Sequence, residues 1–157
     1  MELIVRKYKI MIFFEFSFRI NLSENDIFPL IKECHSERTW IFYPHAQFYS
    51  EDMKCAPATC CFVYEFLYSD EGFKTFLRGE IYNEDQFNKL LLAISISKRF
   101  ETETVIGDFT GQYPFLLIKP DGTVYRTDSI GLGDPKYKTG VFEIDYDLLS
   151  PAVDLSA

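Results

Sequence analysis

The fold of this chain is organised around residues 83–130, NEDQFNKLLLAISISKRFETETVIGDFTGQYPFLLIKPDGTVYRTDSI. The pattern of this stretch predicts one helix, then one strand, then a β-hairpin. The segments before it are rich in the aromatic and β-branched residues that favour strands. We therefore expect a sheet that this unit helps to cover.

The helix is predicted to begin after Asn83, which can cap it, with Gln86 in the capping-box position three residues on. Lys98 and Arg99 fall in the last turn, where the helix dipole favours cations. Apolar residues recur at helical spacing and form one stripe: Phe87, Leu90, Leu91 and Ile94. The sequence therefore predicts a core helix that packs on the sheet through this stripe.

The hairpin follows from an unbroken apolar run and a turn signal. Phe115–Ile118 is apolar at every position, which is typical of a strand covered on both faces. Pro120 suits the second position of a type I turn, and Gly122 suits the left-handed position that closes a bulged hairpin. We expect the partner strand to begin at Thr123.

Further strands complete the predicted architecture. Residues 8–20 alternate, with apolar side chains on one parity, which indicates a strand with one buried face. A short helix is expected near 27–34, with strands near 40–43, 58–68, 73–82, 102–109 and 141–144. The order is β-α-β-β-β-α-β-β-β, so we expect an α+β fold with a mostly antiparallel sheet and two helices. Residues 1–157 are expected to form a single domain with a flexible tail from about 146.

Composition and charge limit the classes of ligand. The chain has 157 residues, of which 47% are hydrophobic and 25% charged, as in a globular domain. Its formal net charge is −8, which disfavours direct binding to nucleic acid or to an anionic membrane. Neither a signal peptide nor a membrane span is expected, and we predict a cytoplasmic location.

The negative charge is concentrated in the last third of the chain. Residues 1–100 carry 12 basic and 14 acidic residues, whereas residues 101–157 carry 4 and 10. We expect this third to dock a basic protein, with acids for steering and aromatic rings for contact. The candidate partner-binding residues are Glu101, Glu103, Asp108, Tyr113, Tyr125, Asp128, Asp134, Tyr137, Phe142, Glu143 and Asp145. The alternative is an acidic surface that serves solubility alone.

The four cysteines lack the spacing of a metal site. Cys34, Cys55, Cys60 and Cys61 contain no CxxC pair, and adding His45 does not complete a recognisable ligand pattern. Cys60 and Cys61 are adjacent in a predicted strand, so their side chains should point to opposite faces. We expect four reduced thiols and no bound metal.

No catalytic signature is present in the sequence. His35 and His45 lie outside any nucleophile motif, and no glycine-rich phosphate loop occurs. Glu101 and Glu103 share a parity and remain a candidate acid–base pair. A binding protein without cofactors is the favoured class, and a small enzyme with an unrecognised carboxylate or Cys-His site is the alternative. A pocket containing His45 or this glutamate pair would favour the enzyme, whereas a convex acidic patch would favour the binding protein.

A small, acidic, single-domain α+β chain without catalytic residues resembles the immunity proteins of bacterial toxin–immunity pairs, including those of contact-dependent growth inhibition. The resemblance covers the whole chain in size and pattern, and it transfers no functional residue. It implies a cytoplasmic bacterial inhibitor that covers the basic active site of one cognate toxin, often a nuclease. A related implication is an acidic mimic of DNA that blocks a nucleic-acid-binding protein.

Overall fold

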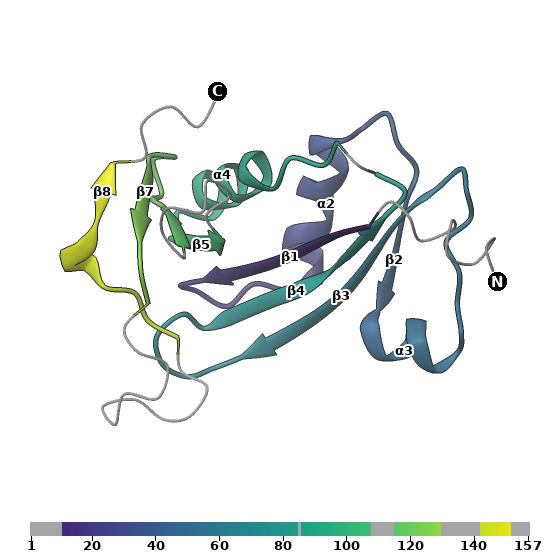
Figure 1. Ribbon diagram of the computed structural model, residues 1–157, viewed down its shortest axis with the longest axis horizontal. Helices are drawn as coiled ribbons and strands as arrows, with labels where there is room; N and C mark the ends of the chain where they lie inside the picture. The colour runs from purple at the N-terminus through teal and green to yellow at the C-terminus, as the bar shows by residue number, and fades with distance from the viewer. Residues whose placement is uncertain (1–10, 85, 108–114, 130–141, 152–157) are drawn as a thin grey trace.

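A computed structural model of the chain describes residues 11–84, 86–107, 115–129 and 142–151 (Figure 1). The elements are β1 Met11–Phe18, α2 Glu24–Cys34, β2 Trp40–Pro44, α3 His45–Ser50, β3 Cys60–Tyr68, β4 Thr75–Tyr82, α4 Lys89–Phe100, β5 Thr104–Gly107, β6 Phe115–Ile118, β7 Val124–Thr127, a 3-10 turn Tyr146–Leu148 and β8 Ser150–Pro151. None of the helices in these ranges is long and apolar enough to cross a membrane.

The strands form one sheet in the order β2-β3-β4-β1-β5-β6-β7-β8. Every neighbouring pair is antiparallel except β2 and β3, so the predicted α+β class with a mostly antiparallel sheet is confirmed. The structure adds a third helix, α3, which follows Pro44 directly. No helix was predicted between residues 44 and 58, and Phe48 is the buried residue of α3.

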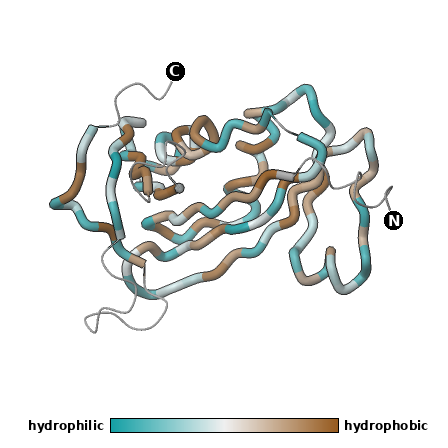
Figure 2. Tube along the Cα trace, in the orientation of Figure 1, coloured by the Kyte–Doolittle hydropathy of each residue, from teal (hydrophilic) through white to brown (hydrophobic). Residues whose placement is uncertain are grey.

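Helices α2 and α4 lie on the same side of the sheet (Figure 1). The alternation predicted for β1 is observed in its described part, because Phe14, Phe16 and Phe18 are buried beneath these helices. Ile31 of α2 and Ile96 of α4 pack into the same core and are fully buried. Figure 2 shows hydrophobic and hydrophilic residues alternating along the strands of this sheet. The core therefore lies between the two helices and one face of the sheet.

Helix α4 begins later than the sequence predicted. It begins at Lys89, and the side chain of Asn88 accepts a hydrogen bond from the Leu91 amide as its cap. Asn83 instead takes a left-handed conformation with a φ of 68°, so it cannot be the cap. The predicted apolar stripe is only partly right, since Leu91 is 45% exposed, whereas Phe87 is buried and Leu90 and Ile94 pack half-buried against the core. The buried face consists of Leu92, Ala93, Ile96 and Ser97.

The predicted hairpin is confirmed. The Gly122 amide donates to the Lys119 carbonyl at 2.9 Å, and Gly122 has a φ of +89°, a conformation that glycine adopts without strain. The Thr123 amide donates to the Asp121 carboxylate at 2.9 Å and secures the turn. Strand β6 is covered on both faces, because Leu116, Leu117 and Ile118 are fully buried.

The chain after β7 returns to the sheet. Ile144 forms an isolated bridge with Ser129 where a short strand was predicted, and Val141 lies outside the described residues. Ser150 and Pro151 form β8, which pairs with β7. Part of the predicted tail from 146 is thus placed against the sheet, while residues 152–157 lie outside the described ranges.

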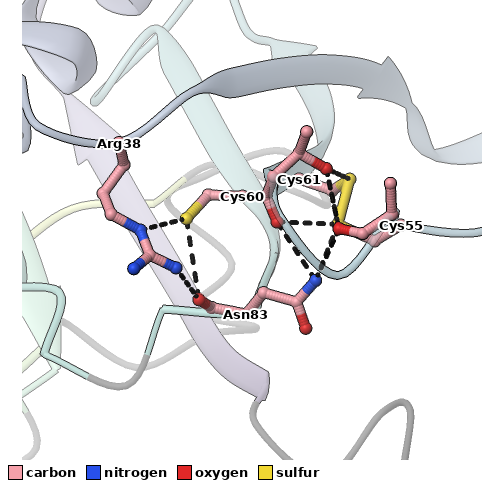
Figure 3. The surroundings of a disulfide bond; sticks show 7 residues. Arg38, Cys55, Cys60, Cys61 and Asn83 are labelled. Atoms are coloured by element: carbon pink, nitrogen blue, oxygen red, sulfur yellow. Dashed lines mark hydrogen bonds between the residues drawn. A yellow bond between two sulfur atoms is a disulfide. The ribbon is translucent and has the colours of Figure 1, made fainter.

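A disulfide joins Cys55 to Cys61, with 5.8 Å between the two Cα atoms (Figure 3). Cys60 and Cys61 point to opposite faces as predicted, and Cys61 therefore faces the loop that carries Cys55. The side-chain amide of Asn83 donates to the Thr59 carbonyl at 3.0 Å and to the Cys55 sulfur at 3.3 Å. These bonds hold that loop against the end of β4. The prediction of four reduced thiols is wrong, because sequence spacing does not show which loop folds back onto Cys61.

The disulfide predicts a specific thiol count. Denatured, non-reduced protein should react with a thiol reagent at two cysteines, Cys34 and Cys60, and at four after reduction. A Cys34→Ser variant should lower each count by one. Four reactive thiols before reduction would show that Cys55 and Cys61 are not joined.

The left-handed turn predicts a cost for any side chain with a β-carbon at Gly122. Gly122→Val should lower the free energy of unfolding by about 1–2 kcal/mol through backbone strain. Gly107→Val is the matched control, because a β-carbon at Gly107 would meet no described atom within 4 Å. Urea unfolding of both variants measures the difference. Equal losses would show that the turn does not require glycine at 122.

Candidate functional site

The second face of the sheet is covered only in part by the described residues. At one end α3 covers it, through a cluster of Phe48, Cys61, Val63 and Tyr82. At the other end Phe142 and Ile144 cover it, packing with Phe73, Val105 and Leu117. The Phe73 amide donates to the Phe142 carbonyl at 3.0 Å and holds this second cover in place. Between the two covers, β1, β3 and β4 present side chains along a groove.

The groove has a volume of about 680 Å³ and is rich in aromatic side chains. Phe13 of β1 lines it and is 62% exposed, although the neighbouring Phe14 is buried. Leu67 from the end of β3 is 49% exposed and also lines it, whereas the side chain of Tyr68 lies on the helix side of the sheet, where its hydroxyl donates to the Leu22 carbonyl at 2.9 Å. Exposed apolar side chains gathered in one depression indicate a contact surface. Because these residues lie on paired strands, the surface is held by the sheet itself.

A smaller pocket of about 300 Å³ adjoins the groove and shares Phe13 and Glu15 with it. His45 at the start of α3 and Glu80 of β4 line this pocket. Glu80 is 8% exposed, which is unusual for a carboxylate, and its Oε1 atom lies 3.9 Å from the Nε2 atom of His45. The pocket that would favour an enzyme is therefore present at His45.

Two tyrosines hold the buried carboxylate of Glu80. The hydroxyls of Tyr49 and Tyr82 both donate to its Oε2 atom, and the two hydroxyls lie 2.8 Å apart. A buried carboxylate needs such donors to offset its loss of hydration. Burial and the hydrogen bond to Glu80 raise the pKa of Tyr82 well above its usual value. The phenol therefore stays protonated and keeps donating.

Charged residues cross the sheet beside this pocket. Arg78 on β4 stands between Glu15 on β1 and Glu65 on β3 in the strand register. Its guanidinium lies 3.0 Å from the Glu65 carboxylate. Glu15 is exposed and forms no ion pair with any residue in the described ranges. Glu15 thus lacks a close ion pair within the described residues, while Arg78 stands opposite it in the register and Lys89 lines the adjoining groove.

The sequence-predicted acids Glu103 and Glu143 lie together around Arg19, away from this pocket. Arg19 makes two hydrogen bonds to Glu143, at 2.7 and 2.8 Å, and stacks 4.0 Å from the ring centre of Phe73. Glu103 accepts from Tyr146 at 2.6 Å and pairs with Lys119 at 3.3 Å. Burial lowers the pKa of Arg19, but the hydrogen bonds and charge interactions with Glu143 and Tyr146 together outweigh it, so the guanidinium pKa is raised.

The remaining predicted partner-binding residues are spread over the fold. Glu101 is exposed at the end of α4, where it has a φ of 50°. Asp128 and Asp145 are half-buried and bonded to nearby backbone amides. Tyr125 and Phe142 pack in the cluster with Phe73 and Val105, and Phe142 also lines the groove. The other four, Asp108, Tyr113, Asp134 and Tyr137, lie outside the described residues.

A third group of polar side chains, His35, Glu37 and Glu84, brings ligand-type atoms within 4.8 Å of one another. Local bonds explain each member. The Nε2 atom of His35 accepts from the Asn88 amide at 3.3 Å, and Glu84 pairs with Arg38 at 3.4 Å. The imagined set of His45, Cys55 and Cys60 does not form a metal site either, because Cys55 is in the disulfide.

Comparison with known proteins provides no relative for this chain. No protein-family model matches it, and neither a curated protein nor a solved structure is significantly similar. Function must therefore be argued from the geometry of the groove and its pocket.

Sequence reasoning missed Phe13, Glu15, Arg78 and Glu80, which line the groove or its pocket. One signal was present: Phe13 stands on the polar parity of an alternating strand, where a large apolar residue is out of place. A second was the run of Arg78 and Glu80 on one parity of a buried strand. Neither signal says that α3 brings His45 and Tyr49 to the same point.

The raised pKa of Tyr82 predicts a loss of stability in alkali. A pKa raised by folding means that the protonated phenol stabilises the fold, fully below about pH 10, and that this contribution disappears as the pH rises further. Above pH 10, the free energy of unfolding of a Tyr82→Phe variant should therefore fall less steeply than that of the parent. Urea unfolding between pH 8 and pH 11 measures this, with the pH 8 difference as reference. If the free energies of unfolding of the two proteins fell in parallel above pH 10, the raised pKa assigned to Tyr82 would be wrong.

Proposed function

We propose that this protein is a binding protein that inhibits a basic protein partner, in the manner of a bacterial immunity protein that neutralises a cognate toxin. The groove on the second face of the sheet is the contact surface in this proposal. The proposed partner is a cognate bacterial toxin, such as a nuclease. The cytoplasmic location expected from the sequence stands against the disulfide between Cys55 and Cys61, because such bonds persist mainly in oxidising compartments. The partner's basic active site would be blocked by the contact.

The observation that carries the proposal is the lining of the groove. This lining exposes aromatic and aliphatic side chains next to a carboxylate that forms no close ion pair with a described residue. Phe13 is 62% exposed and Leu67 is 49% exposed, and a partner would bury this surface. Glu15 supplies a charged rim. Aromatic anchors with a charged rim are typical of protein–protein contacts.

The acidic last third of the chain acts at longer range in this proposal. Glu103 and Glu143 are paired with Lys119 and Arg19, so they are largely neutralised, and the field comes mainly from the other acids of this segment. Exposed Glu101 and half-buried Asp128 add to the same negative field. Such a field speeds association with a basic partner and is screened beyond roughly 8–10 Å at physiological salt.

The pocket beside His45 favours a second candidate, a small enzyme. A buried carboxylate at Glu80, an exposed one at Glu15 and an imidazole in one pocket are groups that can transfer protons. The two candidates differ in their dependence on the groove. Turnover in the pocket would need no protein partner and would tolerate changes at Leu67, which lies outside the pocket lining.

Co-expression with the product of the neighbouring open reading frame, followed by affinity purification, tests the binding proposal. The parent should retain a basic protein, and Phe13→Asp with Leu67→Asp should weaken that complex by about thirtyfold or more, as loss of central contacts does. Association should also slow as salt rises. Biolayer interferometry measures both effects.

Leu91→Asp is the matched control for this test. Leu91 is 45% exposed on α4, on the opposite side of the sheet, and an acid is tolerated in the first turn of a helix. Its complex should match that of the parent, and all variants should keep the thermal midpoint within a few degrees. An equal loss from Leu91→Asp, or no loss from the groove pair, would contradict the proposed surface.

A further inference from the structure

The pocket between β1, β4 and α3 has the chemistry of an acceptor for one cation. Its carboxylates, Glu15 and Glu80, lie on neighbouring strands, and Phe13 of β1 faces Glu80 directly in the register. The Oε2 atom of Glu80 is occupied by the two tyrosine hydroxyls. The hydrogen bonds of the described residues do not include one to the Oε1 atom, and the Nε2 atom of His45 lies 3.9 Å from it.

The one arginine among the described residues that line the pocket, Arg78, already forms an ion pair. Arg78 lines the pocket, but its guanidinium is 3.0 Å from Glu65 on the far strand. The described part of the pocket lining contains two carboxylates, on Glu15 and Glu80, and one permanent cation, Arg78. Lys89 of the adjoining groove donates to the Phe13 carbonyl at 3.2 Å. A ligand that donates hydrogen bonds and carries positive charge therefore fits this pocket better than an anion would.

The pocket wall selects the type of cation. The ring of Phe13 is 62% exposed and forms one side of the pocket, so a planar cation can stack on it. A guanidinium presents several N–H donors in a fixed fork, which can serve two carboxylate oxygens at once. A lysine ammonium has a single compact charge and would use the ring less well.

We propose that this pocket receives an arginine side chain of the partner protein, with Glu80 and Glu15 as acceptors and Phe13 as the stacking surface. The inference rests on the proposed function and identifies the anchor of that contact. It also explains the tyrosine pair, because hydroxyl donors on Oε2 leave Oε1 directed at the pocket. Burial of Glu80 strengthens a charged contact there relative to one on the open surface.

The first arm of the test uses methylguanidinium as a probe on the intact protein. Titration at concentrations far below those that denature should give saturable NMR shifts at the His45 ring and at Tyr82. Glu80→Gln should weaken this binding about tenfold, as loss of a charge-assisted bond does. Glu15→Gln, at an exposed position that does not endanger folding, should weaken it several-fold. Methylammonium should bind more weakly than methylguanidinium.

Glu33→Gln is the matched control, because it makes the same charge change at an exposed residue of α2 that pairs with Arg99. It should leave the probe affinity unchanged. Shifts that do not saturate, or an equal weakening by Glu33→Gln, would overturn the inference. So would a preference for methylammonium.

The second arm uses the complex obtained from the co-expression test. Glu80→Gln and Glu15→Gln should speed its dissociation about tenfold or more, whereas Glu33→Gln should not. If the complex forms but ignores both substitutions, the anchor is overturned and the proposed function stands. If the probe binds but no partner is found, the cation comes from a free ligand, and the assignment to a partner's arginine is overturned together with the proposed function.

Discussion

The pairing of β1 on both of its edges is the interaction on which the rest of the structure depends. This strand lies between β4 and β5, and Phe16 stands opposite Leu77 on one side and Ile106 on the other. In the strand order, the two halves of the sheet are therefore joined through β1. These contacts join residues far apart in sequence, so the sheet cannot close before its last strands are available. The hairpin of β6 and β7 can form locally, but its position depends on β5 and hence on β1.

Because side chains alternate along a strand, the same strands form the core on one face of the sheet and the candidate site on the other. Phe14, Phe16 and Phe18 anchor β1 beneath the helices, and this fixes Phe13 and Glu15 on the opposite face. A site carried by paired strands needs little ordering when a ligand binds, which favours affinity. Glu80 shows the cost of such a site, because a buried carboxylate destabilises the fold unless donors surround it. Tyr49 and Tyr82 supply those donors from α3 and from β4 itself.

Sequence patterns correctly predicted the elements that are determined by residues adjacent in sequence. The turn at Gly122 and the burial of Leu116 to Ile118 follow from residues adjacent in sequence, and both were expected. The start of α4 was predicted wrongly because the side chain of Asn83 does not cap a helix. It forms hydrogen bonds to the loop that contains Cys55. The disulfide was missed for the same reason, since the return of that loop depends on β4. Helix α3 was missed because an aromatic run after Pro44 is compatible with either a strand or a helix.

Charge likewise shows a difference between what the sequence alone predicts and what depends on contacts in the folded structure. The sequence places ten acids in the last third of the chain, but it does not show which of them are already paired. Arg19, from the first strand's end, reaches Glu143 and stacks on Phe73, and this contact ties the C-terminal segment to the sheet. Glu143 therefore has a structural role, whereas Glu15, from the nearly neutral first hundred residues, lacks a described partner. An acid with no partner is the one that gains most from an incoming cation, because a paired acid must first give up its own. For this reason the contact surface is better located by unneutralised carboxylates beside exposed aromatic rings than by the distribution of net charge along the chain.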